Sequence, residues 1–102
     1  NKEYSARYNY MEQYLKEKFK DKVDFLSPGG GLNFFIHLND SVRMDSTELF
    51  YRARDKKVLI TPGVIFYKNF RDGLRYFRIG YSQTSIEKIK EGLDILYNLM
   101  EE

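Results

Sequence analysis

Residues 75–82 read Arg-Tyr-Phe-Arg-Ile-Gly-Tyr-Ser, a run that alternates between two kinds of side chain. Successive residues of a β-strand point to opposite faces of its sheet. A strand here would turn one face toward a core, made by Phe77, Ile79 and Tyr81. The opposite face would carry Tyr76, Arg78 and Gly80. We expect this strand to lead directly into the last helix of the chain.

Arg78 would stand on the face away from the core, beside a glycine that has no side chain. A guanidinium group held on a rigid strand suits a planar anion such as a carboxylate, because it can donate two parallel hydrogen bonds. The ordinary alternative is a solvated surface residue, since arginine is seldom buried. The strand pattern alone leaves both interpretations open.

The composition of the 102-residue chain indicates one folded domain over residues 1–102. Hydrophobic residues make up 42% and aromatic residues 17% of the sequence, which is too apolar for a disordered segment. The net charge of +2 comes from interspersed basic and acidic residues, so no nucleic-acid surface is indicated. The absence of cysteine fits a reducing compartment, and we expect a cytoplasmic location with no membrane partner.

Apolar spacing predicts the order helix, strand, strand, helix, strand, strand, helix. The helices are expected at 4–19, 45–56 and 84–100, and the strands at 23–26, 32–38, 58–60 and 75–82. Asp45 and Thr84 are the expected N-caps, because a glutamate follows each by three residues. Residues 64–73 are expected as a long, aromatic loop. This order favours the α+β class, with helices packed on a small, mainly antiparallel sheet.

The other charged or reactive residues form no complete active site. The glycines at 29–31 open a strand rather than a helix, so they indicate a tight turn and not a phosphate-binding loop. His37 has no cysteine or acidic residue at ligand spacing, so no metal site is predicted. Lys56, Lys57 and Lys68 are expected to be solvated charges.

Four segments, taken together, resemble motifs of the class I/II aminotransferases. Residues 28–38, Pro-Gly-Gly-Gly-Leu-Asn-Phe-Phe-Ile-His-Leu, resemble the family signature P-x-G-G-L/M-x-x-W/F-L/I/V-x-L/F. Residues 58–66 resemble its V-x-V/F-x-P-G-x-x-F segment, and residues 77–82 its L/I/V/F-R-L/I-S/G-F/Y-S strand. Residues 91–96 are similar to the E-G-I/L-x-x-L of its closing helix. Each motif is loose alone, but all four occur in order and cover nearly the whole chain.

The resemblance implies the small, C-terminal domain of a fold-type I, pyridoxal-phosphate-dependent aminotransferase. In that family the arginine matching Arg78 holds the α-carboxylate of the amino-acid substrate, and paired glycines matching Gly30 and Gly31 start a strand close to the substrate cleft. The family's Schiff-base lysine and phosphate-binding residues lie in a large domain that this chain lacks. We therefore expect pyridoxal 5'-phosphate in a full-length parent, and neither tight cofactor binding nor catalysis by the 102-residue chain. Lys57 is a departure, since the family usually has glycine there.

Three interpretations remain open, two of them with a larger parent protein. We favour a MocR-type regulator, in which a GntR-like DNA-binding domain precedes an aminotransferase-like domain, because Gly-Gly-Leu-Asn at 30–33 after a tyrosine-rich helix is similar to many such sequences. The alternatives are a free-standing aminotransferase and a stand-alone α+β binding module. The expected partners are an amino-acid-like carboxylate, the large domain of the same parent, a second copy in a homodimer, and DNA only through a separate N-terminal domain. The start at Asn1, without methionine, fits a piece of a larger protein.

Overall fold

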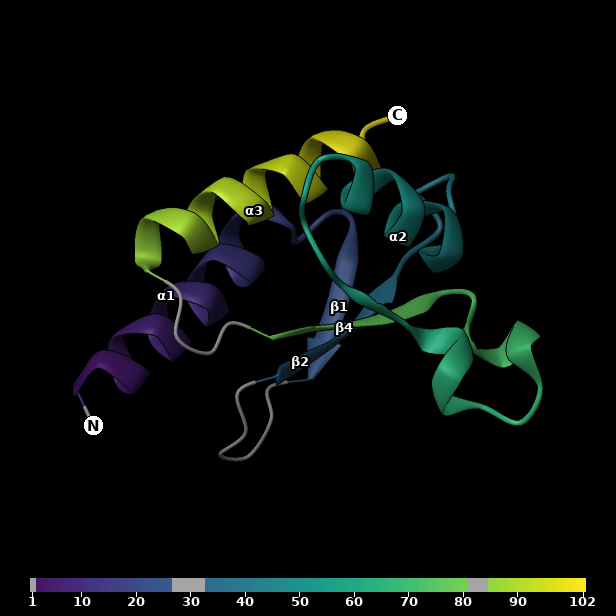
Figure 1. Ribbon diagram of the computed structural model, residues 1–102, viewed down its shortest axis with the longest axis horizontal. Coiled ribbons are helices and arrows are strands. Elements are labelled where there is room, and N and C mark those ends of the chain that lie inside the picture. Colours follow the sequence, from purple (N-terminus) through teal and green to yellow (C-terminus); the bar gives the residue numbers. More distant parts are fainter. Residues whose placement is uncertain (1, 27–32, 81–84) are drawn as a thin grey trace.

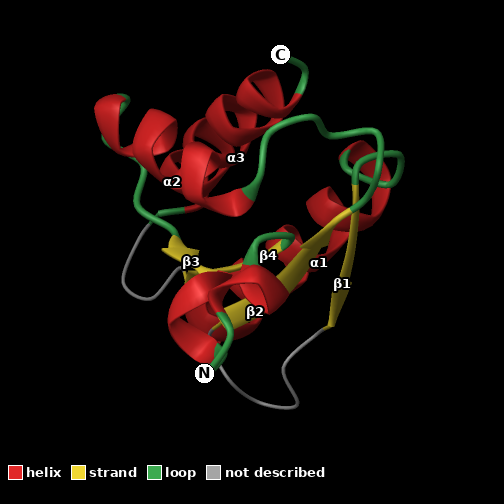
Figure 2. Ribbon diagram, turned by 90° about the vertical axis from the view of Figure 1, so that its right-hand side faces the viewer, coloured by secondary structure: helices red, strands yellow, loops and turns green. Residues whose placement is uncertain are grey.

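In the residues that the computed structural model describes, 2–26, 33–80 and 85–102, three α-helices lie on one face of a four-stranded sheet (Figure 1, Figure 2). The helices are α1 (Lys2–Lys18), α2 (Ser46–Asp55) and α3 (Ile86–Met100). The strands are β1 (Val23–Leu26), β2 (Asn33–Leu38), β3 (Thr61–Pro62) and β4 (Tyr76–Gly80). This arrangement confirms the expected α+β class. None of the helices in the described part is long and apolar enough to cross a membrane.

β4 lies inside the sheet, whose strand order is β1-β2-β4-β3 with antiparallel neighbours throughout. Arg78 therefore has a neighbour on each side, Phe35 of β2 and Thr61 of β3. The alternation expected for β4 is confirmed, because Phe77 and Ile79 are buried while Arg78 is half-buried. Tyr81 lies outside the described residues.

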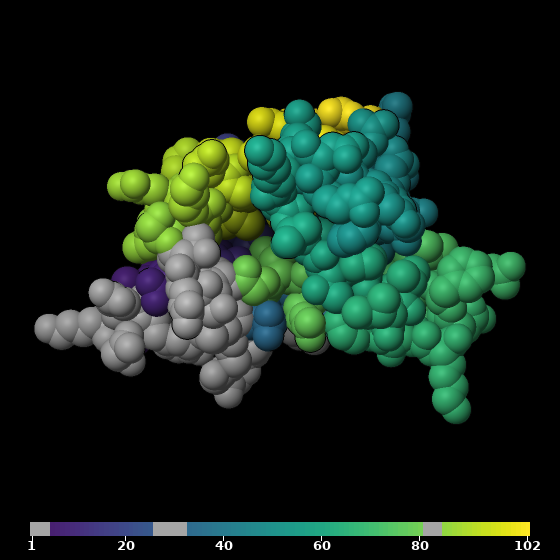
Figure 3. Space-filling view, viewed as in Figure 1, coloured from purple at the N-terminus to yellow at the C-terminus, as the bar shows by residue number. Residues whose placement is uncertain are grey.

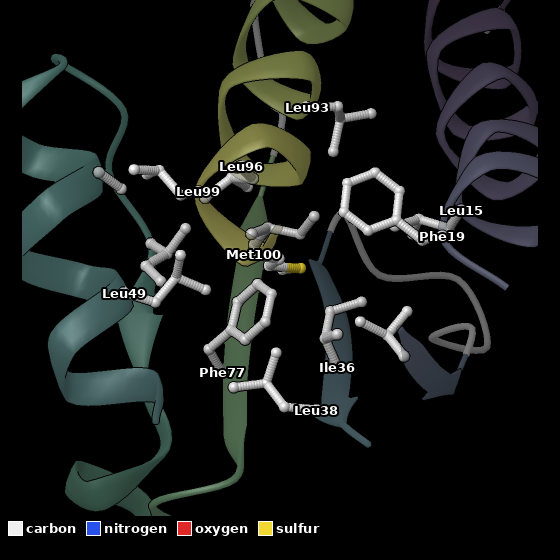
Figure 4. Close-up of a cluster of buried hydrophobic side chains, with 14 of the residues drawn as sticks. Leu15, Phe19, Ile36, Leu38, Leu49, Phe77, Leu93, Leu96, Leu99 and Met100 are labelled. Carbon is white, nitrogen blue, oxygen red and sulfur yellow. The ribbon is translucent and has the colours of Figure 1, made fainter. Parts of the chain in front are cut away.

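The core fills the space between the sheet and the three helices (Figure 4). Phe77 of β4 lies near its centre, with Leu49 of α2 and Met100 of α3 packed around it. Leu15 of α1 and Phe19, just beyond that helix, close the side of the core near β1. Removing these side chains from water is the main favourable term in folding, and it fixes which face of β4 points outward.

The start of α2 is capped as expected and is also tied to a distant turn. The Asp45 carboxylate accepts a hydrogen bond of 2.9 Å from the backbone N–H of Glu48. Ser46 is fully buried, and its hydroxyl donates to the backbone carbonyl of Gly73 at 3.1 Å. The Ser46 backbone N–H donates to the carbonyl of Leu74 at 2.8 Å. One end of α2 is therefore anchored directly to the residues that precede β4.

The start of α3 differs from the sequence prediction by one residue. Ser85, and not Thr84, is the N-cap, because its hydroxyl accepts a hydrogen bond of 3.2 Å from the Lys88 backbone N–H. Thr84 lies outside the described residues. Both residue types cap helices well, and a capping pattern does not separate two adjacent candidates. Ile86 is 39% exposed although it is apolar, because it lies in the first turn, before the helix reaches the core.

The strand expected at residues 58–60 is wrong, and the edge strand is β3 at Thr61–Pro62. The Val58 backbone N–H bonds back to the carbonyl of Ala53 at 2.8 Å, so Val58 completes the exit from α2 instead of pairing with β4. Leu59 is 75% exposed, which also contradicts a central strand. A fully apolar triplet is typical of a buried strand, which is why a strand was predicted here. The sequence alone does not show that the sheet ends at this edge.

Residues 64–73, expected as a loop, contain most of two short 3-10 helices, η1 (Gly63–Phe66) and η2 (Phe70–Gly73), joined by residues 67–69. We call residues 63–73 the side lobe, which projects beyond the sheet in Figure 1. Gly63 and Gly73 hold the lobe closed through direct backbone contact. A Cβ atom added to Gly73 would lie 2.4 Å from the carbonyl carbon and oxygen of Gly63. The two helical turns therefore touch at a point where no side chain fits.

A polar contact joins α1 to α3 on the far side of the core. The Tyr14 hydroxyl donates to the Asp94 carboxylate, which also pairs with Lys90 at 2.7 Å and with Lys18 at 3.6 Å. Burial, and then the negative charge of Asp94, raise the pKa of the Tyr10 phenol. We interpret these contacts as part of the packing of α1 against α3.

Candidate functional site

Arg78 lies on the sheet face that the three helices leave uncovered, which we call the open face. Alternate residues of β2 and β4 form this face: Asn33, Phe35, His37, Tyr76, Arg78 and Gly80. Because β4 is an interior strand, its backbone is held by hydrogen bonds on both sides. The Arg78 side chain is therefore presented from a rigid base, as the sequence predicted.

The Arg78 guanidinium packs on one aromatic ring of the open face, and that ring belongs to a chain of aromatic contacts. Its Cζ atom lies 5.0 Å from the centre of the Phe66 ring, which comes from η1 of the side lobe. The Phe66 ring packs edge-on against Phe35 at 5.8 Å, and Phe35 stacks on Tyr76 at 5.4 Å. A cation over an aromatic face is stabilised by about 0.5–1 kcal/mol at a partly exposed site. These contacts limit the rotamers of Arg78 without using its hydrogen-bond donors.

Among the described residues, no carboxylate lies within ion-pair distance of Arg78. The ion pairs of the described residues all involve other side chains. A guanidinium has five N–H donors in a planar fork, which matches a carboxylate in two parallel bonds. Half-burial lowers the competition from water without removing access for a ligand. No described carboxylate therefore competes with an external planar anion for the Arg78 fork.

Arg75, three residues earlier, shows what a structural arginine looks like in this fold. Its guanidinium donates to the backbone carbonyls of Asn39, Val42 and Met44, at 2.6, 2.8 and 3.1 Å. These bonds fix the loop before α2 to the start of β4. The hydrogen-bond donors of Arg75 are therefore used within the chain, whereas Arg78 has no ion-pair partner among the described residues.

His37 does have an acidic neighbour, which the sequence spacing missed. Its Nδ1 atom lies 3.5 Å from the Asp24 carboxylate, because the register of β1 and β2 places these two residues opposite each other. The His37 ring also packs against Tyr76 at 4.9 Å. Within the described residues, no group of three or more His, Cys, Asp and Glu side chains could hold a metal ion.

Gly30 and Gly31, the other expected site residues, lie outside the described residues. Phe66 and Phe35 were not predicted from the sequence as neighbours of Arg78. Phe66 was contained in the segment at 58–66, but only the fold brings η1 against the open face. The signal for Phe35 was its place in the alternating strand, once the pairing of β2 with β4 is known.

The residues of the open face fit a carboxylate but do not fit the whole of pyridoxal phosphate. None of the four strands contains a lysine that could form a Schiff base with the cofactor aldehyde. Arg78 provides one anion-binding fork, with aromatic side chains beside it. We therefore assign no step of cofactor chemistry to these residues.

Comparison with solved structures finds aminotransferases among the most similar chains. The multiple substrate aminotransferase of Thermococcus profundus has a TM-score of 0.82 at 26% identity, over 98% of this chain and 24% of that one. An archaeal alanine:glyoxylate aminotransferase has a TM-score of 0.82 at 22% identity, over 97% of this chain and 24% of that one. LysN, the α-aminoadipate aminotransferase of Thermus thermophilus, has a TM-score of 0.80 at 24% identity, over 98% of this chain and 25% of that one. The LysN structure contains N-(5'-phosphopyridoxyl)-L-leucine.

These matches define the chain as an aminotransferase-like α+β domain. It spans about a quarter of the length of the aminotransferases that it matches. No protein-family model and no curated protein sequence matches it. The likeness that these comparisons show is therefore one of backbone arrangement.

Proposed function

We propose that this chain is the C-terminal aminotransferase-like domain of a pyridoxal-phosphate-dependent, MocR/GntR-type transcriptional regulator. In this role Arg78 binds the carboxylate of an amino acid or a similar effector. Gly30 and Gly31 would line the same cleft, and the large domain of the parent would hold the cofactor. A DNA-binding domain would be a separate, N-terminal part of the parent, which would act as a homodimer.

The observation that carries this proposal is the state of the Arg78 side chain. It is half-buried on a rigid strand, flanked by Phe66 and Phe35, and no described carboxylate neutralises it. A half-buried guanidinium loses part of its hydration, and this carries a free-energy cost that an internal ion pair would offset. An anionic ligand would offset it in the same manner, and the described residues supply no internal ion-pair partner.

We expect Arg78→Ala in the full-length parent to weaken carboxylate binding by about 2 kcal/mol or more, roughly 30-fold in affinity. Calorimetry would use whichever standard amino acid the unmodified parent binds most tightly. The matched control is Arg71→Ala, because Arg71 is exposed and also lies over an aromatic ring, Phe70, at 5.4 Å. Equal affinities of the parent and the Arg78→Ala variant would reject the assigned role.

A free-standing aminotransferase is the second candidate, because the similar solved chains are themselves aminotransferases. The sequence of the parent before residue 1 distinguishes the two candidates. A winged-helix DNA-binding domain there indicates a regulator. A parent without that domain, whose transamination rate falls when Arg78 is replaced, indicates an enzyme.

The isolated 102-residue chain should not form a Schiff base with pyridoxal phosphate in stoichiometric amounts. Its lysines lie on helices and connections, not on the strands of the open face. Titration of the chain with pyridoxal phosphate, followed by absorbance, measures this directly. A saturable band at one cofactor per chain would contradict the assignment of cofactor chemistry to the large domain.

A further inference from the structure

A cavity of about 440 Å³ lies on the opposite side of β4 from Arg78, between α3 and the residues that follow α2. We call it the α3 cavity, and Figure 3 shows a hollow between the lime atoms of α3 and the teal atoms of α2 and the residues after it. Its floor is apolar and includes Ile60, Ile79, Ile89 and Leu93. Because successive residues of β4 point to opposite faces, Ile79 lines this cavity while Arg78 faces away from it. Gly80 borders both sites, but the side chains that would contact a ligand differ between them.

Gly92 lines the cavity from the middle of α3, where glycine is an unfavourable choice. Glycine lowers helix stability relative to alanine because it has more backbone freedom to lose. A Cβ atom at Gly92 would meet only the Cγ1 atom of Val58, at an ordinary contact distance of 3.9 Å. The described structure therefore does not require a glycine here. What the glycine does is leave space in the cavity wall.

Lys57 lines the same cavity and presents the opposite anomaly. Its backbone has a positive φ of 65°, a conformation that glycine adopts easily and lysine does not. The conformation itself is that of a helix end, since the Lys57 N–H donates to the Arg54 carbonyl at 2.9 Å and the Val58 N–H to the Ala53 carbonyl at 2.8 Å. The helix end does not explain why lysine stands there instead of glycine, so we ask what its side chain does.

The charges at the rim of the cavity are mainly positive. Lys56, Lys57 and Lys88 line it, together with Glu91 as the acidic residue. Lys88 pairs with Glu91 at 3.8 Å, whereas neither Lys56 nor Lys57 has an ion-pair partner among the described residues. The rim therefore keeps two cations beside an apolar floor.

We propose that the α3 cavity binds a small amphipathic anion of the medium-chain carboxylate class. Its hydrocarbon chain lies on the floor, in the space that Gly92 leaves open, and its carboxylate lies at the rim beside Lys56 and Lys57. A volume of this size is within the range of small-molecule sites. Two residue choices that each reduce stability, Gly92 and Lys57, converge on this cavity and are explained by one ligand. The inference does not depend on the function of Arg78.

Decanoate is the probe, titrated below its micelle concentration into the 102-residue chain and followed by calorimetry. We expect saturable binding of one anion per chain, weaker binding of uncharged decanol, and loss of affinity at high salt. Gly92→Leu, which fills the space, should weaken binding by about tenfold or more. Gly92→Ala should leave most of the space and most of the affinity.

Lys57→Gly separates relief of strain from ligand binding. The rise in thermal midpoint follows from the strain alone, whereas the loss of decanoate affinity is the result that a purely structural role would not produce. The substitution should raise the thermal midpoint by roughly 4–8 °C, because strain is relieved, and weaken decanoate binding by about fivefold, because an exposed cation is lost. Lys68→Gly is the matched control, since it removes an exposed lysine of the side lobe. The absence of saturable binding would overturn the proposal. So would affinity that Gly92→Leu leaves unchanged, or a stabilised Lys57→Gly variant that binds as tightly as the original chain.

Discussion

Replacing Gly73 with alanine should lower the free energy of unfolding by about 3 kcal/mol, because the new methyl group has no space. Its Cβ atom would lie 2.4 Å from the Gly63 carbonyl and 2.6 Å from the backbone nitrogen of Val64. These are backbone atoms, so no side chain can rotate out of the way. Moving them would pull Gly73 away from the Ser46 hydroxyl, which donates to its carbonyl.

Thermal unfolding of the variant measures this effect, and the midpoint should fall by roughly 12–24 °C for a domain of this size. Gly63→Ala should behave in the same way, since its Cβ atom would lie 2.5 Å from the Gly73 carbonyl oxygen. The matched control is Gly92→Ala, where the same chemical change makes only an ordinary contact of 3.9 Å with the Val58 side chain. That substitution should be neutral or stabilise the chain by up to about 1 kcal/mol. If Gly73→Ala and Gly92→Ala shift the midpoint equally, the backbone contact between η1 and η2 is not the cause.

The alternation in residues 75–80 was sufficient to predict β4 and the direction of Arg78. A strand with one buried face fixes its register strongly, because a slip by one residue would expose Phe77 and Ile79 and bury a charge. The Asp45 cap was predictable for the same kind of reason, since its partner Glu48 is three residues away. Signals that act over one helical turn or along one strand are present in the sequence itself.

The failures concern contacts that depend on distant parts of the chain. The triplet at 58–60 was predicted as a strand, but whether an apolar segment joins a sheet depends on what lies beside it. His37 and Asp24 meet only through the pairing of β1 with β2, and Phe66 reaches Arg78 only through the side lobe. Of the expected site residues Arg78, Gly30 and Gly31, only Arg78 lies in the described part of the chain, and its aromatic neighbour Phe66 could be found only from the fold.

Arg75 carried no sequence signal, yet its replacement should be among the most damaging in the chain. Arg75→Met keeps a long apolar stem but removes the donors that satisfy the carbonyls of Asn39, Val42 and Met44. Hydrogen bonds from a charged group contribute about 1.5–3 kcal/mol each, and carbonyls that reach water recover part of that loss. We therefore expect the free energy of unfolding to fall by about 3 kcal/mol.

Chemical denaturation of Arg75→Met tests this, with Arg43→Met as the control. Arg43 is exposed in the loop that Arg75 holds, and its replacement removes the same charge without removing these bonds. Arg43→Met should stay within about 0.5 kcal/mol of the original chain, as surface substitutions usually do. Because the loop leads into Asp45 and Ser46, hydrogen exchange should quicken at the start of α2 in Arg75→Met and not in Arg43→Met. Similar losses in the two variants would mean that charge, and not the three backbone bonds, explains the effect.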